Sequence, residues 1–391
     1  MKIMNAAKTF VLSFALAPIL AAPALAQPPQ QSNNQGQNVR SQNFKAQVEV
    51  VFVLDTTGSM GELIDGAKKK IWSIVNEIAS AQPTPIVKIG FVAYRDKGDA
   101  YVTQVVDLNS DLDKAFATLQ TLQADGGGDT PEHVSKGLSD GVHEISWTRG
   151  SSGNSQSGLY QVLFLVGDCP PHTDYNDGYD YKKHAREAAQ RGIVINTIRC
   201  GGNAQTQPIW QEIAGLGKGD YFSIAQSGGV VSVATPYDTE IGTISDKLEL
   251  TTVARRGAVY AARASMSHRA NAALSASGKA DRAEFNSKST QVYGTFDIVA
   301  MQAAGKIDVA KMKDEELPEN MRKMTRTQRV MYIEARTVER RKLQARLGTL
   351  QVKRAAYIRG AAAKKPKTAD GFDVLVNKTI KRQAAKKGLK Y

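Results

Sequence analysis

The sequence has few of the residues that build disulfide scaffolds or zinc sites. Only two of its 391 residues are cysteine and only five are histidine. Two cysteines exclude a small disulfide-rich scaffold. His133 and His143 lie in one predicted helix and are interpreted as ordinary helix residues, so the five histidines do not make a credible zinc site. Few aromatic residues lie among the basic residues of the second half, which argues against nucleic acid as a partner because single strands stack on aromatic rings.

Long apolar runs are also missing, apart from one near the N-terminus. Residues 10–20 are apolar, follow Lys2 and Lys8, and precede an Ala-Leu-Ala sequence that ends at residue 26. This pattern is typical of a secretory signal peptide, 1–26, and the run is too short for a transmembrane helix. We expect an exported protein, periplasmic or otherwise secreted or on the cell surface, with no transmembrane segment after cleavage. Residues 27–44 are rich in Gln, Asn and Pro and are predicted to form a disordered linker.

The net charge of +13 is divided unevenly along the chain. Residues 45–249 contain 17 basic and 26 acidic residues, whereas residues 250–391 contain 31 basic and 12 acidic residues. An acidic domain is therefore followed by a basic extension. We interpret the extension as a helical arm with a solvated charged face, folded back on the acidic domain. The alternative is that it binds an anionic envelope component such as phospholipid or lipopolysaccharide.

Strand-like and helix-like segments alternate over residues 45–249. Such alternation predicts an α/β fold, a Rossmann-like, doubly wound, mostly parallel sheet of six strands with helices on both faces. The gap between the second and third strands is too short for a crossover, so one edge strand should be antiparallel. The predicted strands are 48–54, 87–94, 101–108, 159–166, 193–199 and 220–224, and the predicted helices are 60–80, 111–122, 131–146, 179–191, 205–216 and 237–250.

The basic extension is predicted to be mainly helical. Residues 325–328, Thr-Arg-Thr-Gln, resemble a capping box that precedes a long helix. Along this helix Leu343, Leu347, Leu350 and Tyr357 share a face, which indicates intramolecular packing or coiled-coil pairing. Residues 364–391 are predicted to form a flexible lysine-rich tail with one apolar patch, 372–376.

Polar side chains follow the first strand directly. Asp55, Thr57 and Ser59 place a carboxylate and two hydroxyls in a tight loop that Gly58 allows to turn. Hard oxygen ligands at the carboxyl end of a strand suit Mg²⁺ or Mn²⁺, and open α/β sheets bind their ligands at this edge. The alternative is that Ser59 only caps the next helix and Asp55 is solvated.

Two later segments supply further oxygen ligands. Thr130 ends a glycine-rich loop and precedes Pro131, so it is predicted to cap a helix that starts there and also to face the metal. Asp168 follows the fourth strand and brings a second carboxylate to the same edge of the sheet as Asp55.

These segments resemble the metal-ion-dependent adhesion site (MIDAS) of the von Willebrand factor A (VWA) family. Asp55-Thr56-Thr57-Gly58-Ser59, Thr130 and Asp168 match its three-part motif in order and spacing, and the resemblance covers about residues 47–248. Residues 89–96 and the Gly-Gly-Gly-Asp-Thr-Pro-Glu loop are similar to the branch of hemicentins and of the A domains beside some atypical kinases.

The resemblance implies a metal at the top of the sheet. Its ligands would be Asp55, Thr57, Ser59, Thr130 and Asp168, and the ion would be Mg²⁺, or Mn²⁺ or Ca²⁺. One position would stay open for an Asp or Glu carboxylate of an unknown partner protein, so the expected function is metal-dependent adhesion or protein–protein interaction. The chain departs from the family where Cys-Pro-Pro-His follows Asp168, which changes the rim of the site.

Two further interpretations concern residues near Asp168. His172, Asp174, Tyr175 and Tyr179 are candidates for a rim that contacts the partner, since Tyr is favoured at interfaces; the alternative is a solvated loop that caps the next helix. Cys169 and Cys200 each follow a predicted strand and are expected to form a disulfide if those strands are neighbours, the alternative being two buried thiols too far apart.

Two other functions fit parts of the sequence. A structural envelope protein would act through the basic extension, with the metal site auxiliary. A serine hydrolase would use Ser59 in a strand–turn–helix, with Asp168 and His184 as partners. Thr57 replaces the first glycine of that motif and Asp55 would oppose an oxyanion, so we expect no enzyme.

Overall fold

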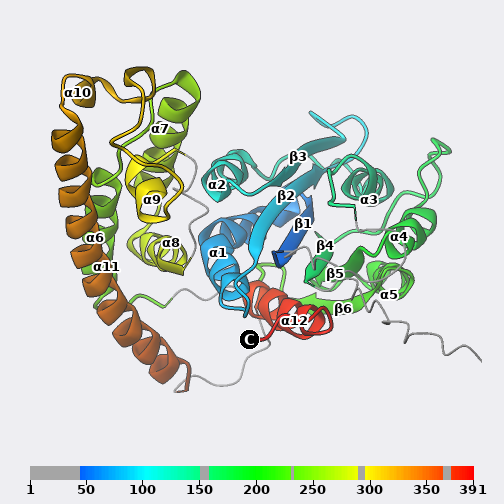
Figure 1. The fold of residues 1–391 in the computed structure, drawn as a ribbon. Helices are drawn as coiled ribbons and strands as arrows, with labels where there is room; N and C mark the ends of the chain where they lie inside the picture. The colour runs from blue at the N-terminus through cyan, green and yellow to red at the C-terminus, as the bar shows by residue number, and fades with distance from the viewer. Residues whose placement is uncertain (1–44, 150–157, 230–232, 289–295, 364–370) are drawn as a thin grey trace, which may run out of the picture. The chain divides into compact units, whose positions relative to one another are not determined.

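Strand β1 (Gln47–Asp55) lies in the middle of a six-stranded sheet (Figure 1). The computed structural model describes residues 45–149, 158–229, 233–288, 296–363 and 371–391; the predicted signal peptide and linker lie outside them. The strand order is β3-β2-β1-β4-β5-β6, and only β3 runs antiparallel, to its neighbour β2. The predicted fold class is confirmed. The other strands are β2 (Ile86–Tyr94), β3 (Thr103–Asn109), β4 (Leu159–Gly167), β5 (Val194–Cys200) and β6 (Lys218–Ile224).

Helices cover both faces of the sheet because the buried strands are apolar on both sides. Successive side chains of a strand point to opposite faces. In β1, Phe52 and Leu54 pack under one layer, and Val51 and Val53 pack under the other. The first layer contains α1 (Gly61–Ala79) and α2 (Leu112–Thr121); the second contains α3 (Val134–His143), α4 (Tyr181–Gln190) and α5 (Thr206–Leu216) (Figure 1).

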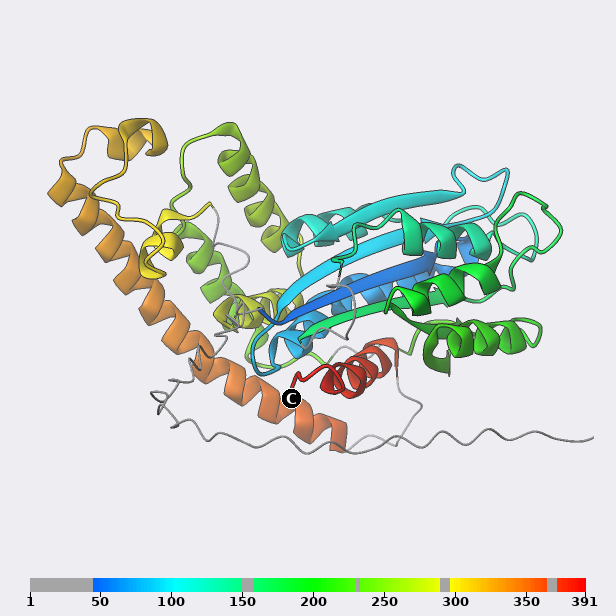
Figure 2. The ribbon, with the colours of Figure 1, turned by 45° about the vertical axis from the view of Figure 1, so that its right-hand side comes forward.

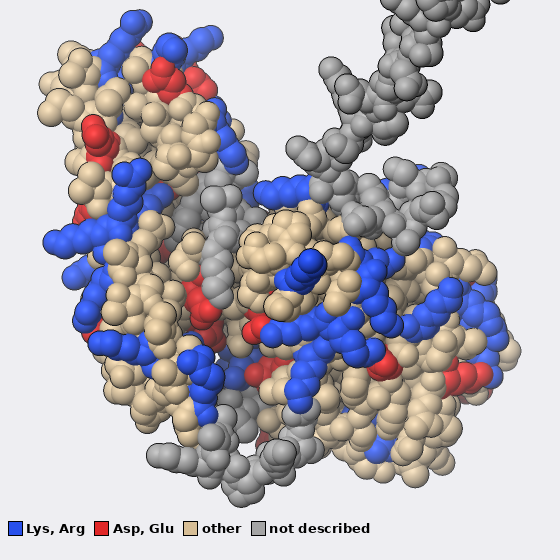
Figure 3. Space-filling model, turned by 60° about the horizontal axis from the view of Figure 1, so that its bottom comes forward, with Lys and Arg blue, Asp and Glu red and all other residues tan. Residues whose placement is uncertain are grey.

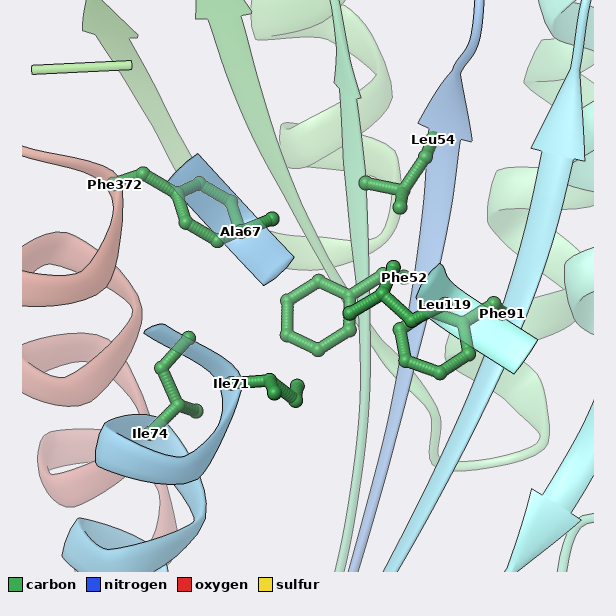
Figure 4. A pocket seen from close by; sticks show the side chains of 8 residues that line it. All are labelled: Phe52, Leu54, Ala67, Ile71, Ile74, Phe91, Leu119 and Phe372. Atoms are coloured by element: carbon green, nitrogen blue, oxygen red, sulfur yellow. The ribbon is translucent and has the colours of Figure 1, made fainter. Parts of the chain in front are cut away.

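The C-terminal helix α12 (Phe372–Ala385) completes the first layer, beside α1. Phe372 is buried, with its ring 5.9 Å from that of Phe52, and both line a small apolar cavity under the sheet (Figure 4). The Gln383 side chain accepts a hydrogen bond of 2.6 Å from the Tyr160 hydroxyl of β4. The prediction of a flexible tail is therefore wrong for residues 371–391. Apolar residues spaced four apart give this lysine-rich segment one face that is buried: Phe372, Val376, Ile380 and Ala384.

The residues between β6 and α12 form a helical insertion rather than a C-terminal arm. In α11, Leu343, Leu347 and Leu350 pack against α6 and α8, which confirms intramolecular packing. A reciprocal capping box starts α11, with Thr325 N donating to Gln328 Oε1 at 2.8 Å and Gln328 N to Thr325 Oγ1 at 3.3 Å. The helices are α6 (Asp238–Leu250), α7 (Ala258–Ala272), α8 (Ala276–Lys288), α9 (Ile298–Ala303), α10 (Glu319–Arg322) and the long α11 (Arg326–Ala363) (Figure 2). Among the described helices, none combines the length and apolar character needed to cross a bilayer.

Buried ion pairs join this insertion to α2 and join helices within the insertion to one another. Arg282 on α8 is fully buried; its Nε lies 2.8 Å from Asp113 Oδ1 on α2, and its Nη1 lies 2.7 Å from Glu249 Oε1 on α6. Arg354 on α11 is bound in the same way, its Nε 2.8 Å from Asp238 Oδ1. Part of the basic charge therefore compensates acidic groups of the same chain, as the folded-back interpretation expects.

Candidate metal centre

Asp55 and the loop after it bring a carboxylate and two hydroxyls together. Asp55 is the last residue of β1, and its Oδ1 accepts hydrogen bonds from the Thr57 amide at 2.9 Å and the Thr57 hydroxyl at 2.6 Å. The Ser59 hydroxyl lies 3.4 Å from that of Thr57, in a short 3₁₀ turn that starts at Gly58. Asp55 and Thr57 are buried, whereas Ser59 is exposed and faces outward.

Asp168 approaches Asp55 because the two strands that precede them are direct neighbours. Strand order reverses on either side of β1, and in α/β sheets such a switch point is where ligands bind. Gly167 permits the close approach, since a Cβ there would lie 2.9 Å from Asp55 Cβ. Gln226, in the loop after β6, donates from Nε2 to Asp168 Oδ2 at 2.7 Å and to the Ser59 carbonyl at 3.1 Å.

The electrostatics of this pair fit a divalent cation. Within the described chain, Oδ2 of Asp55 and Oδ1 of Asp168 are buried and accept no hydrogen bond. Burial, and then repulsion from Asp168, raise the pKa of Asp55 well above its ordinary value. Buried carboxylate oxygens with free lone pairs normally pair with a cation or coordinate a metal. Two carboxylates beside two neutral hydroxyls form the hard oxygen set that Mg²⁺ prefers.

The glycine-rich loop joins the site but does not start a helix at Pro131. The Gly58 amide donates to the Gly126 carbonyl at 3.2 Å, and Gly126 and Gly127 have φ of 77° and 83°, which glycine adopts without strain. Thr130 is exposed and α3 starts only at Val134, with His133 at the N-cap position. The predicted N-cap role of Thr130 is therefore wrong, because the next residues pair with the segment after β4 instead of starting a helix.

Glu132 is a third acid at the site that sequence reasoning missed. It is buried, its amide donates to the Pro170 carbonyl at 3.0 Å, and its Oε2 has no hydrogen-bond partner within the described residues. Burial and the charge of Asp55 raise the pKa of Glu132 to about 9. Glu132 is the last residue of the Gly-Gly-Gly-Asp-Thr-Pro-Glu loop. It lies in the first turn of the helix predicted over residues 131–146, so it was not predicted as a site residue. Gln226 was missed as well, and no local signal marks it.

The four predicted rim residues form an ordered cap. The His172 ring stacks on Tyr175 with centroids 4.0 Å apart, and His172 Nδ1 lies 2.8 Å from Asp174 Oδ1. Tyr175 donates from its hydroxyl to the buried Asp96 after β2, and Tyr179 is partly exposed. The following Asp180 caps α4, as the alternative interpretation expects.

The two cysteines are free, so the structure does not contain the expected disulfide. Gly167 of β4 pairs with Arg199 of β5. β4 ends at Gly167, so Cys169 lies two residues beyond the end of its strand, whereas Cys200 is the last residue of β5. Burial raises the pKa of both thiols, which disfavours the reactive thiolate form.

His184, the partner of Ser59 in the serine hydrolase alternative, contacts other residues. Its Nδ1 lies 3.1 Å from Glu187 Oε2 and 3.3 Å from His143 Nε2, on helices α4 and α3. The loop of Ser59 is instead bound to Asp55 and Gln226.

Comparison with known proteins agrees with this geometry. Residues 49–231 match the family model described as von Willebrand factor A domain. These residues form a VWA domain. VWA domains generally mediate protein–protein interaction. The match contains Asp55, the glycine-rich loop, Asp168 and Gln226, but ends before the helical insertion and α12.

The sequence relatives match parts of this chain. A segment of 154 residues is 34% identical to an ariadne-like RING finger protein of Acanthamoeba polyphaga mimivirus, and 81 residues are 41% identical to von Willebrand factor A domain-containing protein 7 of Mus musculus. These segments cover 39% and 21% of this chain, but only 13% and 8% of the relatives.

Solved structures overlap over a similar share of the chain. Proximal thread matrix protein 1 from the mussel byssus aligns with a TM-score of 0.36 and 14% identity, over 46% of this chain and 42% of its own. The SpRpn10 VWA domain aligns with a TM-score of 0.35 and 14% identity, over 47% of this chain and 91% of its own. One structure of the mussel protein is described as having a zinc-occupied MIDAS motif.

Proposed function

We propose that this protein is an exported, metal-dependent interaction module that binds an acidic group of a partner protein. The observation that carries the proposal is the pair of buried carboxylates, Asp55 and Asp168, each with one oxygen that accepts no hydrogen bond within the described residues. Asp55, Thr57, Ser59 and Asp168 would hold Mg²⁺, or Mn²⁺ or Ca²⁺, with Thr130 in the adjoining loop as a further ligand. The bound cation supplies a Lewis-acid position that a partner's Asp or Glu carboxylate can occupy.

The protein's own residues prepare this position. Thr57 fixes one oxygen of Asp55, and Gln226 fixes one oxygen of Asp168, which leaves the other oxygen of each carboxylate directed into the site. Groups that hold metal ligands in place commonly contribute 10- to 100-fold in affinity. The ordered cap of His172 and Tyr175 lies next to the loop of Asp168 and is a suitable contact surface for the partner.

The test uses the full chain and a displayed library of peptides that contain Asp or Glu. Peptides selected in Mg²⁺ or Mn²⁺ should lose binding in EDTA, in the Asp55→Ala variant, and when their acidic residue is changed to Asn or Gln. Electron paramagnetic resonance of Mn²⁺ measures ion binding separately, since bound Mn²⁺ loses the sharp signal of the free ion. Equal peptide capture in EDTA and in Mg²⁺ would refute the proposal.

A structural role through basic surface is the second candidate. On the face shown in Figure 3, Lys and Arg side chains outnumber those of Asp and Glu, and α12 and the residues after it contribute exposed Lys378, Lys386 and Lys390 to the basic surface. The internal ion pairs of the insertion argue against this role. Arg282 and Arg354 are bound to acidic groups of the same chain and are not available to an anionic partner. Vesicles with anionic lipid, compared with neutral vesicles, separate the two functions, because lipid binding would not require Asp55. Cell fractionation with and without residues 1–26 tests export.

A further inference from the structure

The helix pair α3–α4 places two histidines and a glutamate against one another, away from the Asp55 site. His143 is the last residue of α3, and His184 and Glu187 lie one turn apart on α4. The two helices pack side by side on the second face of the sheet (Figure 1). His184 is buried, whereas the side chains of His143 and Glu187 are 38% and 30% exposed, so solvent reaches the cluster from one side.

Three possible ligand atoms form a small triangle. Glu187 Oε2 lies 2.9 Å from His143 Nε2 and 3.1 Å from His184 Nδ1, and the two ring nitrogens are 3.3 Å apart. Zinc binds nitrogen and oxygen ligands at about 2.0–2.1 Å in tetrahedral geometry, which sets neighbouring ligand atoms about 3.3 Å apart. The observed edges are close to that spacing, so an ion fits above the triangle with little movement of the side chains.

The three ligand atoms converge. Both ring nitrogens face the same carboxylate oxygen, Glu187 Oε2, and each other. In the tautomer that leaves each of these nitrogens unprotonated, all three atoms present lone pairs to the space between them. A cation between the three atoms satisfies all three lone pairs.

We propose that His143, His184 and Glu187 bind a zinc ion that joins α3 to α4 and keeps a fourth position open for water. Two imidazoles and one carboxylate suit Zn²⁺ and not Mg²⁺ or Ca²⁺, which prefer oxygen ligands. The site is separate from Asp55, and the chain would bind two different ions at two places. The proposal does not depend on the proposed function. It replaces the expectation from the sequence that the histidines form no zinc site, because the fold brings Glu187 to two of them.

Cobalt is the probe because four-coordinate Co²⁺ has strong visible absorption, whereas six-coordinate Co²⁺ in an all-oxygen site absorbs weakly. The full chain, stripped with EDTA and held in excess Mg²⁺, should take up one equivalent of Co²⁺ with visible bands. Added Zn²⁺ should bleach these bands, since zinc binds such sites more tightly than cobalt. The variants His143→Ala and Glu187→Gln should bind Zn²⁺ at least about 100-fold more weakly.

Matched variants test whether the effect belongs to this cluster. His268→Ala removes an exposed histidine on α7. His172→Ala removes the histidine of a second group of potential metal ligands in the described residues, which consists of Asp96, Asp129 and His172. Both should keep the cobalt bands, as should Asp55→Asn. Retained bands in Glu187→Gln, or no visible band in the wild type, would overturn the proposal.

Thermal unfolding supplies a readout that does not depend on colour. Zinc at 100 times its Kd should raise the Tm of the wild type by about 4 °C and leave that of Glu187→Gln unchanged. The metal-free Tm of this variant reports whether it folds. A zinc-induced shift of equal size in the variant would contradict the assignment.

Discussion

Replacing Asp55 by asparagine separates a metal site from an ordinary buried carboxylate. The substitution keeps the shape of the side chain and an oxygen that can accept the two hydrogen bonds from Thr57. It removes one of two neighbouring negative charges, the other being Asp168. Without a metal, the wild type must therefore bear a repulsion that the variant lacks.

The size of that repulsion can be worked out. Two unit charges 4 Å apart repel by about 4 kcal/mol at an effective dielectric constant near 20. Protonation of Asp55, whose pKa is raised, and the amide of Gln226 both relieve part of it. We therefore expect metal-free Asp55→Asn to be more stable than the metal-free wild type by about 2 kcal/mol, half the full value.

Magnesium should act on the wild type alone. At 100 times its Kd, the ion stabilises a protein by about 2.7 kcal/mol, which is about 4 °C in Tm for a compact unit that spans residues 44–391. The assay is thermal unfolding followed by circular dichroism at about pH 8, in EDTA and in MgCl₂. Asp65→Asn, a change at an exposed position on α1, is the matched control and should behave as the wild type does. The reasoning is refuted if Asp55→Asn is less stable than the wild type in EDTA, or if it keeps the Mg²⁺ shift.

Three further outcomes are expected. Gln226→Ala should weaken Mg²⁺ binding about 10- to 100-fold in calorimetric titrations and lower the Tm in EDTA, because it removes the hydrogen bond to one oxygen of Asp168; unchanged affinity would remove Gln226 from the site. Phe372→Ala should cost about 3–5 kcal/mol in denaturant unfolding, since its ring fills the core beside Phe52; the half-exposed Val374→Ala on the same helix should cost less than about 0.5 kcal/mol, and equal costs would refute the packing of α12. Mg²⁺ affinity should fall as pH is lowered from above neutrality, because Asp55 must be ionised to bind the ion and its raised pKa makes it protonate at higher pH than an ordinary aspartate; affinity that stays constant down to the ordinary aspartate range would contradict that pKa direction.

The segments near the start of the chain show how much local sequence specifies. The apolar run that ends at Asp55 predicted a central buried strand, and the short gap before β3 predicted the one antiparallel edge. Asp55, Thr57 and Ser59 are close in sequence, so their convergence follows from one tight loop. Asp168 could be added because parallel strands end at the same edge of a sheet.

Contacts between segments far apart in the sequence could not be predicted from local sequence patterns. Glu132 was assigned to a helix that starts two residues later, because its pairing partner lies after β4. The expected disulfide depended on two residues that follow different strands, and the structure holds both cysteines as free thiols. Register is set by packing of whole strands, which a local pattern does not specify.

The sequence by itself determined the alternation of strands and helices, the loop of Asp55, and the division into acidic and basic parts, since each depends on residues close together in the chain. Only the tertiary structure decided that α12 belongs to the core of the sheet and that His143 meets His184 and Glu187. The physical reason is the same in both cases. A helix has one buried face, and which neighbour covers that face depends on how the whole chain packs.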